Sequence, residues 1–320
     1  MDELLLRQMP HSTEAEQAVL GSMLIDAACV KDVMDQLQPD DFYLRQNREI
    51  FETIYTMFVY SRPIDGLTVA GELEKAGLAN DGTRAYLAQL MEVTPTSANV
   101  LEYVRLVREK ALLRSVAAAA AEITAMGQKC QIVLGDICTP ETAEKFAAAA
   151  EEWGGLDILV NNAGILDRDG TLQTTPETFD HIIQVNLVSV FRITQKLLQA
   201  LCESKGCIVN ITSSASRAPH PNANPAYGAS KAGLTALTRQ WALEFAPQGV
   251  RINAVQCGPI ETDMSQSWTP EYREKVMSAV PLHRLGTPWD VARCAVFLAS
   301  EQAAYITGAS LNANGGKLME

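Results

Sequence analysis

A tyrosine and a lysine stand one helical turn apart in the segment Tyr227-Gly228-Ala229-Ser230-Lys231. The i, i+4 spacing places the phenol and the ammonium on one face of a helix. Free tyrosine is a poor base at neutral pH because its pKa is about 10, and a nearby ammonium in a partly dry site lowers that pKa. The pair therefore predicts proton transfer to or from an alcohol or ketone. Two surface residues on an ordinary helix are the alternative for so short a motif.

Other polar residues stand near the ends of expected strands upstream of this pair. Thr212-Ser213-Ser214 follows the apolar run Cys207–Ile211, and Asn161-Asn162-Ala163-Gly164 closes another apolar run. The carboxyl ends of parallel strands are where α/β proteins bind ligands. Asn186 lies in an expected helix, where a buried asparagine is more often a satisfied core group than a functional one. A functional role for these residues is indicated only when they are considered together with Tyr227 and Lys231.

The elements that must position these residues alternate between strand and helix after Gly127. Such alternation predicts a doubly wound parallel sheet with right-handed crossovers. The expected strands are Cys130–Gly135, Leu156–Asn161, Gly206–Ile211, Val250–Val255 and Ala309–Asn312, and the expected helices are 140–153, 176–203, 226–247 and 288–300.

From about residue 119 to its end, the chain resembles the short-chain dehydrogenase/reductase family. The residues that carry the resemblance are Gly135-Asp136, Asn161-Asn162-Ala163-Gly164, Asn186, Ser213-Ser214, Tyr227 with Lys231, Asn253, Gly258-Pro259, Thr262 and Gly315-Gly316. In that family a Rossmann-like sheet binds NAD or NADP. The resemblance implies an NAD(P)-dependent oxidoreductase acting on an alcohol or a ketone.

The resemblance also implies catalytic roles. Tyr227 would be the general acid or base, and Lys231 would lower its pKa and hold the nicotinamide ribose. Asn186 would hold a water in the proton relay, and a serine would bind the substrate oxygen. Strand register points to Ser213, whereas the commoner spacing to the tyrosine points to Ser214; we prefer Ser213 and leave the choice open.

Cofactor contacts follow from the same resemblance. Tyr227 and Lys231 would bind the cofactor as well as act on the substrate. The remaining implied contacts are Asp136 on the adenine side, Asn161, Ala163 and Gly164 along the cofactor, and Ile260 and Thr262 at the nicotinamide amide. Cys257 departs from the family, which usually has proline before Gly258.

The first strand, glycine-rich turn and helix of the family are missing. Neither GxGxxG nor GxxxGxG occurs in the sequence, although such a turn cradles the cofactor pyrophosphate. The loss leaves an unpaired edge on the strand at 156–161. That strand would pair directly with the one at 130–135, or a partner chain would cover the edge. The sequence leaves open the substrate, NAD versus NADP, and whether the truncated sheet binds a cofactor at all.

Residues 10–114 read as helices and resemble the N-terminal domain of DnaB-type replicative helicases. The matching residues are Pro10-His11-Ser12, 14–22, Asp41-Phe42-Tyr43, Ile50-Phe51, Pro63-Ile64-Asp65 and Val107-Arg108-Glu109-Lys110. In that family the domain forms a collar and contacts primase. The sequence lacks GxxxxGK[ST], so ATP hydrolysis is not supported. Thr13 and Glu16 have the spacing of a capping box.

Composition restricts the class of partner. The net charge is −12, both halves are acidic, and the pI is about 4.9, which argues against direct nucleic-acid binding. The seven cysteines include no CxxC pair and the four histidines are scattered, so we expect reduced thiols and no metal site. The sequence shows neither a signal peptide nor a membrane span, and we expect a cytoplasmic protein.

We therefore expect an all-α domain over 1–115 followed, over 116–320, by an α/β domain with an incomplete Rossmann-like, doubly wound parallel sheet. The leading functional hypothesis is an NAD(P)-dependent oxidoreductase with a small alcohol or ketone substrate, impaired by the missing loop. The alternative is a non-catalytic oligomerisation or adaptor module with a primase-like partner. A recombined reading frame without joint function is a third hypothesis. A homo-oligomer is expected, and its state is left open.

Overall fold

The computed structural model describes residues 9–220, 223–262, 265 and 268–319. The chain divides into two compact units, residues 1–132 and 133–320, and each is described by itself. Among the helices that the structure describes, none has the length and apolarity needed to cross a membrane.

The first unit is helical and surrounds one apolar core. Leu20, Phe42, Phe51, Ile54 and Leu90 are among its fully buried side chains. The helix α1 begins after Ser12, whose side chain accepts a hydrogen bond from Ala15 N, so the cap is Ser12 rather than Thr13. The helices of this unit are α1 (Thr13–Ile25), α2 (Val30–Met34), α3 (Arg45–Val59), α4 (Gly66–Lys75), α5 (Thr83–Val93) and α6 (Val100–Ala125).

A buried carboxylate fixes the start of α3. Glu16 is 1% exposed and accepts hydrogen bonds from Tyr43 N (2.7 Å), Leu44 N (3.3 Å) and Asn47 Nδ2 (2.9 Å). The N-cap residue of α3, Leu44, has no side-chain acceptor of its own. A negative charge at a helix N-terminus accepts hydrogen bonds from the free backbone N–H groups. It also interacts favourably with the positive end of the helix dipole. Glu16 of α1 thus supplies the cap that the sequence of α3 lacks.

The helix α6 contains the join between the two resemblances. Its first half buries Val100, Val104, Val107 and Ala111, at the spacing of one helix face, against the first unit. The alanine run at 117–121 has the highest intrinsic helix propensity, which lets the helix continue to Ala125 beyond that core. The transition therefore needs no loop.

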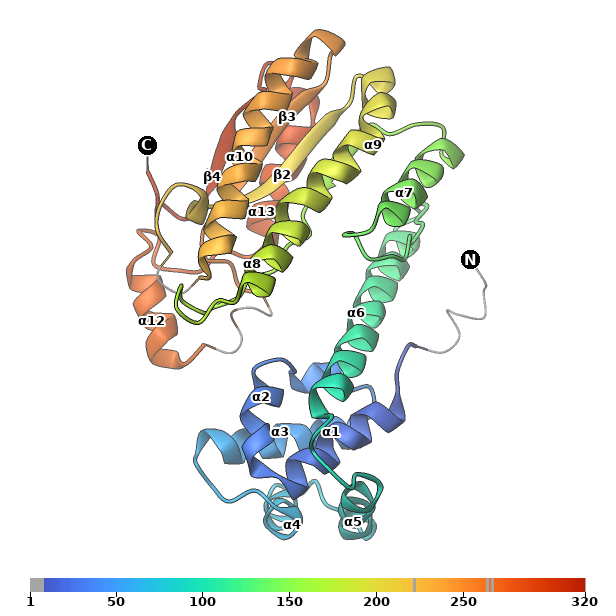
Figure 1. Cartoon of the computed structure of the whole chain (residues 1–320), viewed down its shortest axis with the longest axis vertical. Helices are drawn as coiled ribbons and strands as arrows, with labels where there is room; N and C mark the ends of the chain where they lie inside the picture. Colours follow the sequence, from blue (N-terminus) through green and yellow to red (C-terminus); the bar gives the residue numbers. More distant parts are fainter. Residues whose placement is uncertain (1–8, 221–222, 263–264, 266–267, 320) are drawn as a thin grey trace. The chain divides into compact units, whose positions relative to one another are not determined.

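In the described residues, the sheet of the second unit has four parallel strands in the order β1-β2-β3-β4. Figure 1 labels β2, β3 and β4 of this sheet. One row of aligned residues across the sheet is Asn161, Asn210, Ala254 and Ser310. The elements are α7 (Pro140–Glu152), β1 (Ile158–Asn161), α8 (Pro176–Ile183), a π-helical turn (Gln184–Val188), α9 (Ser189–Ser204), β2 (Cys207–Ser213), α10 (Pro225–Phe245), β3 (Arg251–Cys257), α12 (Pro270–Ser278), α13 (Pro288–Ala299) and β4 (Ser310–Ala313).

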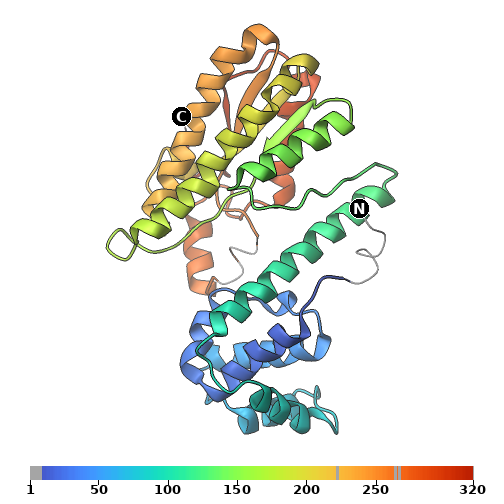
Figure 2. The same cartoon turned by 45° about the vertical axis from the view of Figure 1, so that its right-hand side comes forward.

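Helices cover both faces of this sheet, as Figures 1 and 2 show. On one face Ile208 of β2 packs with Leu234 and Trp241 of α10. On the other face Val209, the next residue of β2, packs with Leu298 of α13. Successive residues of a strand point to opposite faces, so a strand buried on both sides reads as a continuous apolar run. The predicted α/β class, with an incomplete doubly wound parallel sheet after a helical region, is confirmed.

The strand predicted at Cys130–Gly135 is wrong, because this segment forms no strand in the structure. In the described residues β1 pairs with β2 alone and forms an edge. Ile158 and Val160 of β1 are 47% and 46% exposed, whereas Val209, paired with Val160, is fully buried. The strands that would connect residues 130–135 to the sheet in the family are missing, so the isolated segment has no ladder to join.

Glycine substitutions in two helices of the first unit should have opposite effects on stability. A Cβ at Gly21 of α1 would lie 2.3 Å from Leu90 O, whereas a Cβ at Gly71 of α4 meets nothing within 4 Å. We expect Gly71→Ala to raise the free energy of unfolding by about 0.5–1 kcal/mol through helix propensity. Gly21→Ala should lower it by about 1–3 kcal/mol because α1 and α5 must move apart. Urea unfolding followed by circular dichroism checks both, and a stabilised Gly21→Ala variant would contradict the observed packing.

Candidate active site

The start of α10 carries the tyrosine and the lysine and is fixed by Asn224. The Asn224 side chain accepts a hydrogen bond from Ala226 N (2.9 Å) and donates one to Thr174 Oγ1 (2.8 Å). Pro225 occupies the first helical position, where its missing N–H costs nothing. This cap places Tyr227 in the first turn of α10 and Lys231 one turn later.

Lys231 is a buried cation at the carboxyl end of β2. The residue is 5% exposed, and its Nζ donates a hydrogen bond to Ile211 O (2.9 Å). The Nζ atom lies 5.9 Å from the centre of the Tyr227 ring. Burial disfavours the charged form and lowers the pKa of Lys231 to about 8. The ammonium is therefore retained at neutral pH but is lost under mildly alkaline conditions.

Tyr227 is held as a neutral phenol. Burial raises its pKa, and this outweighs the lowering by a side-chain hydrogen bond with Ser213. Burial therefore dominates the pKa of Tyr227, and the lowering that the sequence leads us to expect from Lys231 does not offset it. The Lys231 Nζ donates its hydrogen bond to Ile211 O and lies 5.9 Å from the centre of the Tyr227 ring. A phenol with a raised pKa is suited to donate a proton rather than to accept one.

Of the two candidate serines, Ser213 is the one whose side chain contacts Tyr227 in the described residues. Ser213 is the last residue of β2, and its Oγ also accepts a hydrogen bond from Ala215 N (3.1 Å). Ser214 begins the short 3-10 turn Ser214–Ser216. The strand register that favoured Ser213 in the sequence thus places its hydroxyl beside the phenol.

Asn186 lies in the π-helical turn between α8 and α9 and is fully buried. Its Oδ1 accepts a hydrogen bond from Ile165 N (2.8 Å), and its Nδ2 donates to Ile165 O (2.9 Å) and to Ser230 Oγ (3.1 Å). These bonds hold the segment after β1 against α10. The Asn186 side chain thus has a structural role, because it links Ile165 to Ser230. Its carbonyl oxygen already accepts a hydrogen bond from the backbone N–H of Ile165.

The backbone of Gly164 lies close to the side chains of Lys231 and Asn186, and we call this close approach the cradle at Gly164. A Cβ at Gly164 would lie 3.2 Å from the Lys231 Nζ and 3.3 Å from the Asn186 Oδ1. A side chain at this position would crowd both polar groups. The glycine therefore keeps the backbone close to the buried ammonium.

Asn161 takes part in a polar network that sequence reasoning missed. Its Nδ2 donates to Asn210 Oδ1 (2.8 Å) and to Thr194 Oγ1 (3.2 Å), and Asn210 Nδ2 donates to Thr238 Oγ1 (2.9 Å). The network joins α9, β1, β2 and α10. Its signal in the sequence was a single asparagine inside the apolar run of β2. Ala163 follows the network and is exposed.

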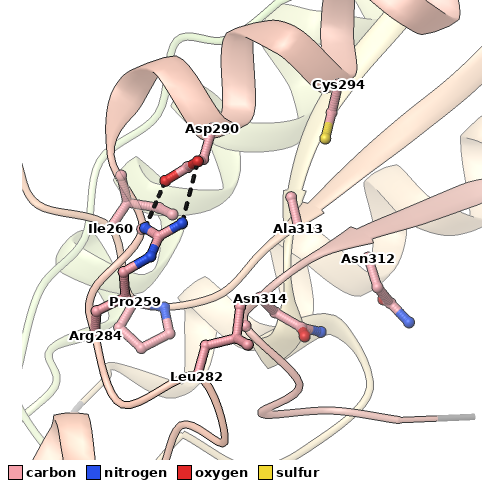
Figure 3. A pocket seen from close by; sticks show the side chains of 11 residues that line it. Pro259, Ile260, Leu282, Arg284, Asp290, Cys294, Asn312, Ala313 and Asn314 are labelled. Atoms are coloured by element: carbon pink, nitrogen blue, oxygen red, sulfur yellow. Dashed lines mark hydrogen bonds and ion pairs between the residues drawn. The ribbon is translucent and has the colours of Figure 1, made fainter.

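Ile260 and Thr262 lie in the loop after β3. Ile260 forms an isolated parallel bridge with Gly286 and lines a cavity of about 260 Å³ (Figure 3). The ion pair between Arg284 and Asp290 (2.7 Å) closes one side of this cavity. Thr262 is exposed, and its N–H donates to Ser265 Oγ (3.0 Å).

Asp136 is not brought to the other predicted residues. It is exposed, and its Oδ1 accepts a hydrogen bond from Cys138 N (2.8 Å) in the turn before α7. Among the described residues its hydrogen bonds are local, to Cys138 and Thr139, and do not reach Tyr227 or Lys231. The strand expected at 130–135, which would have brought Asp136 to the sheet, does not form in the structure.

Cys257 is a further member of the cluster. It pairs in register with Ser213 across β2 and β3. Burial raises the pKa of its thiol to about 11, although the nearby Lys231 ammonium lowers it. The neutral thiol therefore adds a non-ionic surface beside the buried lysine. Its sequence signal was the departure from the proline usual in the family.

These residues fit one end of a nicotinamide dinucleotide and not the other. Tyr227, Lys231 and the cradle at Gly164 provide donors and close backbone approach for a ribose and its ring. For the diphosphate, the described residues offer no glycine-rich turn that leads from a strand into a helix, the arrangement that binds such anions. The segment after β1 leads instead into irregular backbone at 162–175.

Two family models match the chain. Residues 104–317 match the model described as enoyl-(acyl carrier protein) reductase. Residues 8–109 match the DnaB-like helicase N terminal domain. The two matches overlap within α6, at 104–109. The first covers most of the chain.

Curated relatives match the same second part. The 3-oxoacyl-[acyl-carrier-protein] reductase FabG of Vibrio cholerae is 40% identical over 187 residues, which are 58% of this chain and 76% of that protein. The protein FixR of Bradyrhizobium diazoefficiens is 42% identical over 168 residues, which are 51% of this chain and 59% of FixR. The chain thus spans little more than half of FixR.

Solved structures show the same architecture. A short-chain type dehydrogenase/reductase from Mycobacterium marinum superposes with a TM-score of 0.60 at 29% identity, over 64% of this chain and 83% of that one. A 3-oxoacyl-[acyl-carrier protein] reductase from Brucella melitensis gives a TM-score of 0.60 at 28% identity, over 64% and 78%. Together with the family match over 104–317, these likenesses show that the chain belongs to the short-chain dehydrogenase/reductase family, joined at α6 to a DnaB-like helicase N-terminal segment.

Proposed function

We propose that this oxidoreductase unit reduces a ketone with NADH or NADPH, with Tyr227 as the proton donor. The observation that carries the proposal is the neutral phenol of Tyr227, bonded to Ser213 and placed beside the buried Lys231. A group that is protonated at neutral pH serves as a general acid. The names of the relatives that act on 3-oxoacyl groups agree with a ketone substrate.

Reduction of a ketone needs a hydride at the carbonyl carbon, which a bound dihydronicotinamide supplies, and a proton at the oxygen. The Tyr227 hydroxyl donates that proton, and the C=O bond becomes an alcohol while the phenol becomes a phenolate. Ser213 donates a hydrogen bond to the same oxygen and orients it. The Lys231 ammonium stabilises the transient phenolate, since an opposite charge nearby favours the charged form.

The cofactor assignments differ in their support. Gly164 and Lys231 gain support from the cradle at the end of β2. Ile260 gains support from its position in the loop beside the cavity. Asp136, Asn161, Ala163 and Thr262 rest on the family match alone, and the Asn161 side chain is already engaged by Asn210 and Thr194. The choice between NAD and NADP has no support in either direction.

Removing the phenol hydroxyl should abolish turnover. We expect Tyr227→Phe to lower kcat for ketone reduction by about a hundredfold or more, because general acid catalysis contributes on this scale. Tyr305→Phe is the matched control, since Tyr305 is fully exposed. The measurement is the initial rate of NAD(P)H oxidation with a 3-oxoacyl substrate. Equal rates for Tyr227→Phe and the wild type would exclude the phenol from the reaction.

The two serines should separate in the same assay. We expect Ser213→Ala to lower kcat/KM by about tenfold or more through loss of the bond that orients the substrate oxygen. Ser214→Ala should retain most of the activity because Ser214 lies in the turn beyond the strand. A larger loss for Ser214→Ala would assign the role to Ser214 instead.

Activity should fall as the pH rises through about 8. Lys231 is charged below its pKa of about 8 and neutral above it, so alkaline conditions remove the ammonium that stabilises the phenolate. The measurement is kcat against pH for the wild type and for Lys231→Met. We expect the alkaline decline to disappear in the variant, whose residual rate is low. A wild-type rate that stays level through this range would contradict the role given to Lys231.

A further inference from the structure

A buried glutamine connects β3 to the turn that follows Ser213. Gln256 is the second-last residue of β3, lies in register with Thr212 of β2, and is 0% exposed. Its Nε2 donates a hydrogen bond of 3.3 Å to Ser216 Oγ, in the 3-10 turn Ser214–Ser216. The side chain thus reaches past the end of β2 and holds the turn from the neighbouring strand.

The carbonyl oxygen of the same amide is unsatisfied. Gln256 Oε1 is buried and has no hydrogen-bond donor among the described residues. A buried acceptor without a donor lowers stability by more than one neutral hydrogen bond adds to it. The bond to Ser216 is also longer than the usual range for N–H···O. An apolar side chain of the same shape would avoid the penalty, so stabilisation of the core does not explain a glutamine here.

The turn held by Gln256 determines where the Ser213 hydroxyl points. Ser213 Oγ accepts a hydrogen bond from Ala215 N (3.1 Å), which leaves its O–H to donate elsewhere. That hydroxyl makes the side-chain hydrogen bond with Tyr227. The turn also packs on α10, where a Cβ at Gly228 would lie 3.4 Å from Ala215 O. A shift of the turn would therefore move the Ser213 hydroxyl relative to the phenol.

We propose that Gln256 positions the Ser213 hydroxyl for ketone reduction, by holding the turn at 214–216 through Ser216. The turn then directs this hydroxyl toward the Tyr227 phenol and the substrate oxygen. The hydrogen bond of Gln256 goes to Ser216, so the amide acts through Ser213 and is a positioning residue. Its effect on the rate rests on the proposed function, whereas the contact between Ser213 and Tyr227 can be measured without turnover.

Gln256→Met removes the amide and keeps the length of the side chain. We expect its stability to be equal to or higher than that of the wild type, because the buried acceptor is gone and Ser216 is partly exposed and can bond water. Urea unfolding followed by circular dichroism measures this. A destabilised Gln256→Met variant would show that the glutamine serves the core and would overturn the proposal.

The NMR signal of Tyr227 reports its hydrogen bond without any cofactor. In the full chain labelled with ¹³C at the tyrosine Cζ, Tyr227→Phe identifies this signal. We expect Ser213→Ala to shift it, because the phenol loses its partner. Gln256→Met should shift it in the same direction, and Ser213→Ala combined with Gln256→Met should shift it no further than Ser213→Ala alone. Thr212→Val is the matched control, since it deletes a buried hydrogen bond to Val255 O between the same two strands and should leave the signal in place.

Reaction rates test the catalytic consequence. Gln256→Met and Ser216→Ala remove the same hydrogen bond from its two ends. Each should lower kcat for ketone reduction by about threefold to tenfold, the scale of one hydrogen bond. The two changes together should lower kcat no more than one of them, because they act on one interaction. Thr212→Val should retain the wild-type rate.

A Tyr227 signal that stays in place in Gln256→Met, while Ser213→Ala moves it, would overturn the proposal. An equal shift in Thr212→Val would overturn it too, because any lost bond between the strands would then have the same effect. A signal that Ser213→Ala does not move would leave no contact to position and would also contradict it. If the wild type shows no turnover, the proposed function fails, and the NMR comparison still decides whether Gln256 positions Ser213.

Discussion

The buried ammonium of Lys231 is the constraint on which the site depends. A charge that is 5% exposed must find a partner, because desolvation without compensation is costly. Lys231 finds it in Ile211 O, at the carboxyl end of β2. That bond fixes the rotation and height of α10 against the sheet. As a result Tyr227 meets Ser213, and Gly164 is required where the backbone passes the ammonium.

Over the described ranges, the sheet of this chain lacks the first strand, glycine-rich turn and helix that lie beside the site in other members of the family. β1 is an edge in the described residues, and Ile158 and Val160 remain half exposed on the face that α13 covers farther along the sheet. The buried network from Asn161 through Asn210 to Thr238 keeps β1 attached despite its free edge. The residues for proton transfer therefore do not depend on the glycine-rich turn that would anchor a dinucleotide. The described part of this chain has Tyr227, Ser213 and Lys231 but not that turn.

Much of this was predictable from residue pattern, because the information was local. The cap, the proline and the i, i+4 pair at the start of α10 lie within a few residues of one another, as does the apolar run of β2. The strand at 130–135 was not predictable, because strand formation there depends on neighbours that this chain does not contain. The raised pKa of Tyr227 could not be predicted either, since it depends mainly on how deeply the tertiary structure buries the phenol. Asn210 was visible as a polar interruption, but its partners lie on other elements.

The most direct test of the account is a titration of the full chain with NADH, followed by nicotinamide fluorescence, beside a complete 3-oxoacyl reductase as reference. A missing diphosphate anchor removes several backbone hydrogen bonds and a helix terminus from the binding energy. We expect weak binding that does not saturate in the range where the reference saturates, and weaker binding still for Lys231→Met. Saturation with a Kd of about 1 µM, a binding free energy of about −8 kcal/mol, would show that this chain anchors the dinucleotide by other means and would contradict the account.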